Sequence, residues 1–600
     1  MCGIAAVTGP DSHAEVIALV RAMRHRGPDS HGVVSYPFAA MGMSRLKVMD
    51  PRALADQPMT RGTNTLVYNG ELYNFKELRA ELADCGVAFE TDGDTEVVLE
   101  ALRTWGAEQA CKRFEGMFAF VYADTVSGAI WFARDRFGIK PLYWRARGGG
   151  GIAICSEAKY LASGGEYEPS ALAEYFEFGS PISKCVFDNV LELQPGTLMT
   201  LRAGSIDQVR FSPEIDFGNQ TNLTPADALH KSLEQHLRAD RRIALWLSGG
   251  FDSAILLATA RDIGVETLAL TLATGCNDDE VRRARRTADH YGVAHEIVTV
   301  DPGHVAAHMA AFTTAMDQPT IDGFNTYLMS RATQLADCAV AISGLGGDEV
   351  MGGYGYYRTR PMMNAAASVL RRLPTSVRMP VVRVAAKRMQ QSPARLLAMV
   401  QAHDVASAHA GARTVFHSAE VQQLIGRDSI AVESTPGLST RQEFARLDFD
   451  RYLRPTLLRD SDVFSMACGV ELRVPLLDAD FVGSVLQSAE PPTKSVLAQY
   501  WNDPYLVDLA NAPKLTFSMP WRSWMTAVLE HDMPLLHSDA PWGEHVDADV
   551  ARQMMSVAVA TPHDSPLRLW SFAVLANWIA SRERADTSGA TGAATCQVAA

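Results

Sequence analysis

Cysteine at position two is a candidate nucleophile. The chain opens Met1-Cys2-Gly3-Ile4. Methionine aminopeptidases remove Met before a small residue, so the mature chain is expected to begin at Cys2 with a thiol and a free α-amino group on one residue. An α-amino group with a pKa near ~8 can take the proton from the thiol. The sequence therefore predicts an N-terminal nucleophile.

Five further residues could complete a site that hydrolyses an amide. Such a site needs hydrogen-bond donors for the developing oxyanion as well as a nucleophile. Asn69 offers a side-chain amide, and Gly70 lets a backbone N–H approach closely. For an amino acid substrate, Arg45 suits the carboxylate, while Glu71 and Asp94 suit the ammonium group.

A second group of residues could bind a pyrophosphate. The run Leu247-Ser248-Gly249-Gly250-Phe251-Asp252-Ser253 lies between an apolar strand, expected over 243–247, and a helix, expected over 253–263. Serine hydroxyls and N–H groups at a helix N-terminus bind phosphate. Asp252 would repel a phosphate unless Mg²⁺ bridged the two, so the loop predicts a magnesium–nucleotide complex. The spacing is that of neither a Walker nor a Rossmann loop.

A second glycine-rich loop follows the expected strand 339–342. It reads Ser343-Gly344-Leu345-Gly346-Gly347-Asp348-Glu349. Ligands of open α/β sheets bind at the carboxyl ends of strands, where this loop is expected. Asp348 is therefore the second candidate ligand for Mg²⁺.

The elements that must position these residues change character along the chain. Residues 1–205 show short apolar runs and turns, which predict strands. Residues 206–224 have the composition of a linker, and 225–585 alternate strands and helices, which predicts a parallel α/β sheet. Within that part, 359–440 is expected to be a helical insertion, and 586–600 a disordered tail.

Bulk composition narrows the class of protein. The chain has 600 residues, which is too long for one hydrophobic core, so two or more domains are expected. Its net charge of −14 disfavours a general nucleic-acid binder. Its nine cysteines form no CxxC pair, which fits a reducing cytoplasm better than disulfides or structural zinc. There is no secretory signal and no apolar run long enough for a membrane span. We expect a cytoplasmic enzyme, and a homodimer is left open.

Residues 1–205 resemble the glutaminase domain of class II (N-terminal-nucleophile) glutamine amidotransferases. The likeness rests on Cys2, Arg45, the run Asn69-Gly70-Glu71 and Asp94, in the order of that family. It implies an α+β N-terminal-nucleophile sandwich domain and a γ-glutamyl thioester on Cys2. It also implies an oxyanion hole at Asn69 and Gly70. The glutamine-binding residues that it implies are Arg45, Asn69, Glu71 and Asp94.

The rest of the chain, to about residue 530, resembles the synthetase domain of the asparagine synthetase family. It has the SGGxDS loop, Asp279-Glu280, the run from Gly469 to Asp478, and Lys514 before Leu515-Thr516-Phe517. The resemblance implies an α/β parallel-sheet ATP-pyrophosphatase domain with helical additions, and a role for Lys514 on the phosphates and the adenylated intermediate. The implied ATP contacts are Leu247, Ser248, Gly249, Gly250, Asp252, Ser253, Leu270, Ser343 and Gly344, with Mg²⁺ on Asp252 and Asp348.

Leu345 departs from the family pattern. Glutamine-dependent asparagine synthetases usually have Glu there, whereas a GLGGDE run resembles tailoring amidotransferases of secondary metabolism or surface polysaccharides. We therefore expect an amidotransferase whose acceptor is a small or carrier-bound carboxylate other than free aspartate. The alternatives are a true asparagine synthetase, an intramolecular amide-forming cyclase resembling β-lactam synthetases, and a non-catalytic regulatory relative.

Overall fold

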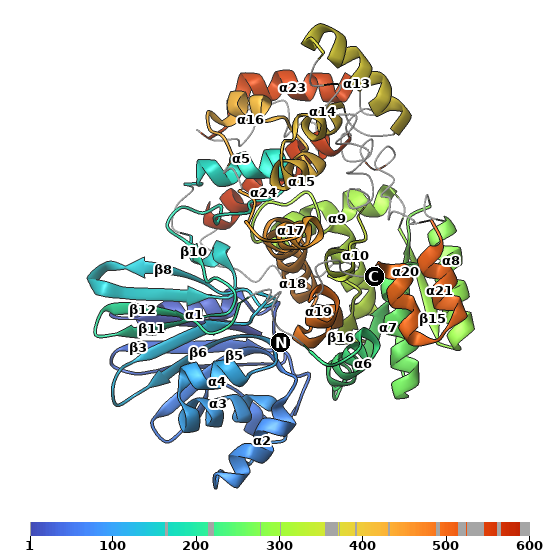
Figure 1. Ribbon diagram of the computed structural model, residues 1–600. Helices are drawn as coiled ribbons and strands as arrows, with labels where there is room; N and C mark the ends of the chain where they lie inside the picture. The colour runs from blue at the N-terminus through green and yellow to red at the C-terminus, as the bar shows by residue number, and fades with distance from the viewer. Residues whose placement is uncertain are drawn as a thin grey trace.

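The computed structural model shows an N-terminal domain of antiparallel sheets followed by a parallel sheet with many helices (Figure 1). This arrangement confirms the predicted fold class. The structure describes residues 2–162, 166–213, 221–275, 278–300, 302–354, 370, 373–389, 393–429, 433–487, 493–513, 524, 545–560 and 566–587.

Two six-stranded antiparallel sheets form the N-terminal domain. Their strand orders are β10-β8-β9-β1-β3-β2 and β12-β11-β7-β6-β5-β4. The first contains β1 (Cys2–Thr8), β2 (Ser30–Ser35), β3 (Ala39–Arg45), β8 (Tyr143–Arg147), β9 (Gly151–Cys155) and β10 (Leu191–Glu192). The second contains β4 (Met59–Arg61), β5 (Asn64–Leu72), β6 (Gly116–Asp124), β7 (Ile130–Arg134), β11 (Thr197–Arg202) and β12 (Ser205–Arg210).

The two sheets pack face to face. Along their strands, one set of alternate residues is apolar and points toward the other sheet, and the residues between them are apolar and point outward. Ile4 and Ala6 of β1 belong to the core between the sheets, together with Val67 of β5. Ala5 and Val7 face the other way, into the core beneath α1 (Ser12–Ala22). The outer face of the second sheet is covered by α2 (Phe75–Asp84), α3 (Asp94–Trp105) and α4 (Ala107–Arg113). Cys2 therefore starts a central strand that is buried on both faces.

A five-stranded parallel sheet organises the second domain. Its order is β15-β14-β13-β16-β17, with β13 (Ile243–Trp246), β14 (Leu268–Ala273), β15 (His295–Thr299), β16 (Val340–Ile342) and β17 (Glu471–Arg473). The apolar faces of α6 (Pro225–His236), α7 (Phe251–Ile263) and α8 (Asp278–Tyr291) share one core with it. On the other face lie α9 (Pro302–Ala315), α10 (Phe324–Leu335) and α18 (Arg459–Ala467).

Strand order reverses between β13 and β16. The chain proceeds from β13 to β14 and β15 on one side of β13, and then returns to place β16 on the other side. Ligands of open α/β sheets bind at such a switch point. The two predicted loops follow these two strands, so the topology brings them together.

Helical additions surround this sheet. They include α13 (Thr375–Met389), α14 (Pro393–Gln401), α15 (Val405–Arg413), α16 (Ser418–Ile425), α17 (Thr440–Asp448) and a π-helical segment, η4 (Phe449–Leu458). The other α-helices of the described residues are α5 (Pro169–Phe178), α11 (Gly347–Met351), α19 (Ala479–Leu486), α20 (Lys494–Leu497), α21 (Pro504–Asn511), α23 (Ala548–Ala560) and α24 (Pro566–Thr587). The described parts of the predicted insertion are therefore mainly helical.

Two predicted boundaries differ from the structure. The expected linker starts at residue 206, but β12 continues to Arg210 because it pairs residue by residue with β11. The expected tail starts at residue 586, but α24 continues to Thr587, and the rest of the tail lies outside the described residues.

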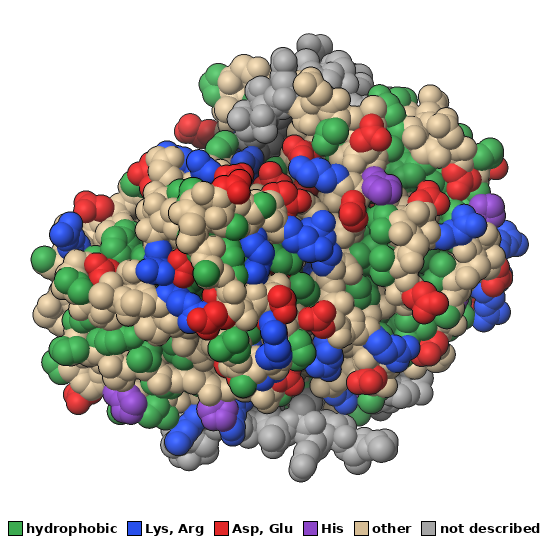
Figure 2. Space-filling model, turned by 90° about the horizontal axis from the view of Figure 1, so that it is seen from below, with side chains coloured by type: hydrophobic (Ala, Val, Ile, Leu, Met, Phe, Trp, Pro, Cys, Tyr) green, Lys and Arg blue, Asp and Glu red, His purple; other side chains and the backbone are tan. Residues whose placement is uncertain are grey.

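Basic, acidic and hydrophobic side chains are mixed over the face seen in Figure 2. Within the described part of the chain, no helix is long and apolar enough to span a membrane.

Candidate active sites

Cys2, the predicted nucleophile, is held by several contacts at the start of β1. Cys2 is 5% exposed, and its Cα pairs with that of Arg45 on the neighbouring strand β3. Its backbone N–H donates to Asn69 Oδ1 at 2.9 Å, and its carbonyl accepts from Arg26 Nε at 3.2 Å. Burial raises the pKa of the Cys2 thiol, and the Arg45 guanidinium opposes this rise. The thiol therefore needs a base to become a nucleophile at neutral pH.

Asn69, which with Gly70 is predicted to form the oxyanion hole, contacts the backbone of Cys2. The Asn69 side chain is fully buried, and its oxygen is engaged by Cys2 N–H, so its orientation is fixed. Its Nδ2 has no hydrogen-bond partner among the described atoms. An unpaired buried donor costs about 1–3 kcal/mol, which a bound oxyanion would recover. A Cβ at Gly70 would lie 2.1 Å from the carbonyl oxygen of Met117, so only glycine fits there.

The carboxyl groups of Glu71, on β5, and Asp94 interact with each other. Both are buried, and Asp94 Oδ2 accepts from Tyr68 Oη at 3.0 Å and from the N–H of Leu72 at 2.9 Å. Burial and the charge of Asp94 raise the pKa of Glu71 well above its usual value, and burial also raises the pKa of Asp94. Two buried carboxyls that repel each other are stabilised by a cation between them, so the ammonium of an amino acid suits this place.

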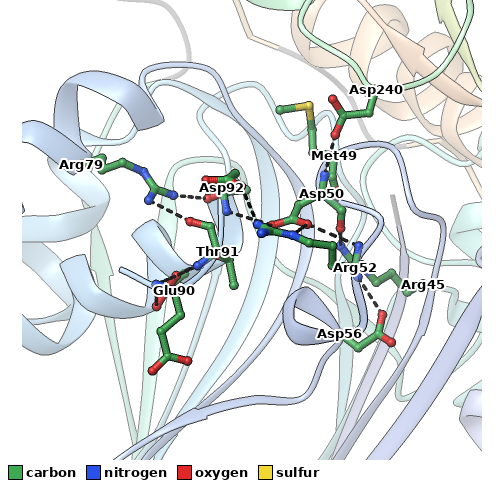
Figure 3. Close-up of polar contacts among 12 residues, drawn as sticks. Arg45, Met49, Asp50, Arg52, Asp56, Arg79, Glu90, Thr91, Asp92 and Asp240 are labelled. Atoms are coloured by element: carbon green, nitrogen blue, oxygen red, sulfur yellow. Dashed lines mark hydrogen bonds and ion pairs between the residues drawn. The ribbon is translucent and has the colours of Figure 1, made fainter. Parts of the chain in front are cut away.

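Arg45 is anchored rather than free to move (Figure 3). Its Nη1 donates to Asp56 Oδ1 at 2.7 Å, and its Nη2 donates to the carbonyls of Met49 and Asp50 at 3.1 and 2.9 Å. These bonds use three of the five guanidinium donors. Arg52 in turn pairs with Asp50 and lowers the pKa of that carboxyl. The remaining donors of Arg45 suit a substrate carboxylate.

The predicted pyrophosphate loop joins β13 to α7. Gly249 has a φ of +66°, and a Cβ there would lie 2.5 Å from the carbonyl oxygen of Glu280, so the turn requires glycine. Ser253 Oγ accepts from the N–H of Ser248 at 3.1 Å. The loop borders a pocket of about 440 Å³. Seven of the nine predicted ATP-binding residues line it: Leu247, Ser248, Asp252, Ser253, Leu270, Ser343 and Gly344.

The two predicted magnesium ligands lie together. Lys494 Nζ contacts Asp252 Oδ2 at 2.7 Å and Asp348 Oδ1 at 2.5 Å, so oxygens from both loops converge on one cation. Among the described residues, no group of three or more His, Cys, Asp or Glu side chains could hold a metal. Two carboxylates fit Mg²⁺ nonetheless, because Mg²⁺ commonly takes its other ligands from water and substrate phosphates.

Lys494 was missed from the sequence, since a lone lysine after Pro-Pro-Thr has no diagnostic spacing. It begins the short helix α20 and is mostly buried, and the two carboxylates raise its pKa after offsetting desolvation. Lys514, the lysine that the sequence favours, lies outside the described residues. The roles assigned to the predicted site residues stay predictions.

Acidic and tyrosine side chains also line this pocket. Asp322 accepts from Tyr452 Oη at 3.1 Å, and Glu349 accepts from Tyr354 Oη. Burial, followed by the charges of its neighbours, raises the pKa of Glu349 to about 7. Leu345 lines the same pocket. The position that departs from the family pattern thus lines the same pocket as the carboxyl groups of Asp322 and Glu349.

A buried ionic cluster joins the two domains. Arg26 Nη2 contacts Asp462 Oδ2 at 2.7 Å, and Lys140 Nζ contacts Asp462 Oδ1 at 3.2 Å. Arg26 Nη1 also contacts Glu157 Oε1 at 3.2 Å, and none of these four side chains is more than 1% exposed. The paired residues lie 131, 322 and 436 positions apart in the sequence, so sequence spacing gave no signal. Through Arg26, α18 of the second domain is linked to the backbone of Cys2.

Comparison with known proteins matches both domains. Residues 1–212 match a family model described as "Glutamine amidotransferase domain", and residues 225–580 match "Asparagine synthase". The chain is 26% identical to "Asparagine synthetase [glutamine-hydrolyzing] 1" of Bacillus subtilis, covering 96% of each protein. It is 29% identical to a putative asparagine synthetase of Mycobacterium bovis, covering 96% of this chain and 97% of that one.

A human asparagine synthetase is 30% identical over 62% of this chain and 70% of its own length. Among solved structures, a B. subtilis glutamine phosphoribosylpyrophosphate amidotransferase aligns with 50% of this chain and 81% of its own, at 15% identity and a TM-score of 0.29. The second family model alone covers more than half of the chain. The chain therefore belongs to the asparagine synthase family and carries a glutamine amidotransferase domain ahead of the synthase domain.

Proposed function

We propose that the protein is a glutamine-dependent ligase that converts a carboxylate to an amide at the expense of ATP. The observation that carries the first half is the buried, unpartnered Asn69 Nδ2 beside Cys2. The Cys2 thiolate attacks the γ-amide carbon of glutamine, and the oxyanion is stabilised by Asn69 and the N–H of Gly70. The C–N bond breaks and ammonia leaves with the thiol proton. Water then hydrolyses the thioester to glutamate.

The pocket at the switch point supports the second half. A carboxylate oxygen of the acceptor attacks the α-phosphorus of ATP, and pyrophosphate leaves. Ammonia attacks the resulting acyl adenylate, and AMP leaves with the formation of an amide. Asp252 and Asp348 would hold Mg²⁺, which when bound offsets the negative charge of the phosphates. The seven cysteines that the structure describes as free suit a reducing cytoplasm.

We propose further that the acceptor is a carboxylate other than free aspartate. Leu345 provides neither a charge nor a proton acceptor where asparagine-forming relatives usually have Glu. An unpaired buried ammonium would cost several kcal/mol. Asparagine synthesis is the second candidate, because the relatives carry that name and because Asp322 in the same pocket could pair an ammonium group.

The test is a screen for pyrophosphate release over carboxylic acids, with glutamine or ammonium as the nitrogen source. The proposal expects glutamate formation without ATP, and pyrophosphate release only with an acceptor. Efficient asparagine formation from aspartate, with kcat/KM of about 10⁴ M⁻¹s⁻¹ or above, would favour the second candidate instead. Absence of glutamate formation would overturn the glutaminase half.

A further inference from the structure

Arg473 belongs to a strand that borders the nucleotide pocket. It ends β17, which pairs in parallel with β16 and places Arg473 opposite Ile342. The carbonyl of Arg473 accepts a hydrogen bond from the N–H of Ser343 at 2.9 Å. Ser343 opens the glycine loop that lines the pocket. The backbone of Arg473 thus fixes the first residue of that loop.

The side chain of Arg473 extends in the other direction, into the glutaminase site. Its Nη2 lies 3.3 Å from Oε1 of Glu71, two residues after Asn69 on β5. This contact is an ion pair rather than a hydrogen bond, and Nη2 makes no hydrogen bond among the described atoms. Arg473 is completely buried. One residue therefore contacts both sites.

Other contacts leave the guanidinium little freedom. Nε donates to Glu471 Oε1 at 2.5 Å, and Nη1 donates to the carbonyls of His236 and Arg238 at 2.5 and 2.7 Å. These carbonyls lie at the C-terminal end of α6, in the second domain. The side chain is therefore tied to the synthase domain at three points, and a shift of β17 would carry Nη2 along with it.

The electrostatics at Glu71 depend on this contact. Burial and the charge of Asp94 raise the pKa of Glu71, and the charge of Arg473 opposes this rise. A small displacement of Nη2 changes a charge–charge interaction in a buried place, where such interactions are strong. The ability of Glu71 to hold an ammonium group would change with it.

We propose that Arg473 is a positioning residue that couples the two sites, so that glutamine binds more tightly when the synthase site holds a nucleotide. The proposal rests on the function proposed above. Nucleotide binding fixes the Ser343 loop, and Arg473 transmits this order to Glu71. Because such coupling is reciprocal, glutamine must strengthen nucleotide binding by the same factor. Couplings of this kind typically amount to 5- to 150-fold.

The decisive measurement is glutamine affinity in Cys2→Ala, which binds glutamine without cleaving it. Calorimetry with and without α,β-methylene-ATP and Mg²⁺ gives the coupling directly. We expect the analogue to lower the glutamine Kd about 10-fold, and Arg473→Met in this background to reduce that effect to below about 2-fold. A 10-fold effect that survives Arg473→Met would overturn the proposal.

Kinetics of the Cys2-containing protein separate coupling from general damage. Arg473→Met should raise the KM for glutamine about 10-fold, while the kcat with ammonium stays within about 3-fold, because the backbone bond to Ser343 is kept. Arg473→Lys should restore part of the KM but not the coupling, since a lysine lacks the fork that binds both carbonyls. An equal loss of ammonium- and glutamine-dependent synthesis would indicate a structural role and overturn the assignment.

Arg238→Met is the matched control. Arg238 also crosses the interface, where its Nη1 donates to the carbonyl of Tyr73 at 3.1 Å, and its own side chain makes none of the contacts to Glu71 described here. It should leave the coupling intact, and loss of coupling in this control would reassign the effect to the interface as a whole.

Hydrogen exchange of the unsubstituted protein provides a test that needs no variant. The analogue should slow exchange in residues 64–72, the strand that carries Glu71. Unchanged exchange there would contradict the proposal even if Arg473→Met failed to fold. Glutamate formation by the same protein without nucleotide tests the proposed function separately, because glutaminase activity without coupling overturns only the inference.

Discussion

The two sites of this protein differ in how much of each is already built. In the N-terminal site the proposed nucleophile, Cys2, is 5% exposed, and the side chain of Asn69 is fixed with its Nδ2 free of hydrogen bonds among the described atoms. In the synthase site a pocket of about 440 Å³ is lined by several carboxyls, and Lys494 lies between the two that are expected to hold Mg²⁺. One site is arranged for a single small substrate, whereas the other must rearrange its cations when MgATP enters.

The elements that supply each site explain this difference. The glutaminase residues come mainly from β1, β3 and β5, whose backbones are locked by neighbouring strands on both sides. The synthase residues come from loops at the ends of β13 and β16 and from a short helix. Strand positions define geometry closely, and loops can adapt to a larger ligand.

The largest expected effect is on the nucleophile. Cys2→Ala should reduce glutamate formation by at least about 10⁴-fold, because no other group replaces a lost nucleophile. Synthesis with added ammonium should persist, since the synthase pocket lies in the other domain. Glutamate formation and ammonium-dependent pyrophosphate release are measured on one preparation. Residual hydrolysis of glutamine at the original rate would show that Cys2 is not the nucleophile.

Substitution of the two carboxylates in the synthase pocket should have the opposite effect: synthesis is lost and glutamine hydrolysis is kept. Asp252→Asn and Asp348→Asn should each slow acceptor-dependent pyrophosphate release on the order of 10²-fold or more, because a ligand of Mg²⁺ opposite the phosphates is lost. Glutamate formation should continue. Asp262→Asn, on the exposed side of α7, is the control and should behave like the unsubstituted protein. Rapid pyrophosphate release by either loop variant would remove these carboxylates from the mechanism.

The preference of the enzyme for one acceptor carboxylate over another should change with residue 345 of the synthase pocket. We expect Leu345→Glu to raise kcat/KM for aspartate roughly 30-fold, since a charge partner for a buried ammonium is worth about 2 kcal/mol or more. Leu345→Gln has a similar shape without the charge and should give much less. Asparagine formation is followed with saturating MgATP and ammonium. Equal gains from Glu and Gln would show that pocket shape, rather than charge, selects the acceptor.

Sequence reasoning succeeded where residues act within one local segment. The fold class follows from the change of apolar pattern along the chain, and the strand expected over 339–342 is observed as Val340–Ile342. The same is true of the loop after β13, where glycine is required at Gly249 by a positive φ and a close backbone contact. These features leave a signal because the local chain conformation itself demands particular residue types.

The contacts between domains left no such signal. Arg473 lies in a run that the sequence marked as family-like, yet its approach to Glu71 depends on how two domains dock. Lys494 reaches two carboxylates that lie 242 and 146 residues away. An isolated Arg or Lys is usually a solvated surface residue, so only tertiary structure distinguishes these buried cations. The Arg26–Asp462 pair illustrates the same limit.

The smallest expected effect concerns stability at the border of the two domains. His236 is buried at the end of α6, with its ring 3.9 Å from the ring of Tyr73 in the glutaminase domain. Burial lowers the pKa of His236 to about 3 from 6.5. The folded protein therefore holds the neutral ring, whereas an unfolded chain takes up a proton below pH 6.5. Stability from this residue is present above pH 6.5 and is lost as the pH falls toward 3.

At pH 5 this loss should be about 2 kcal/mol of unfolding free energy for the domain that unfolds with α6. His236→Gln removes the titrating group, so the decrease in stability between pH 7 and pH 5 should be smaller by about that amount. Urea unfolding at both pH values, followed by tryptophan fluorescence, measures it. His403→Gln, at a mostly exposed side chain, should leave the pH dependence unchanged. If His236→Gln and the unsubstituted protein lose equal stability between pH 7 and pH 5, burial between the two domains does not keep the His236 ring neutral.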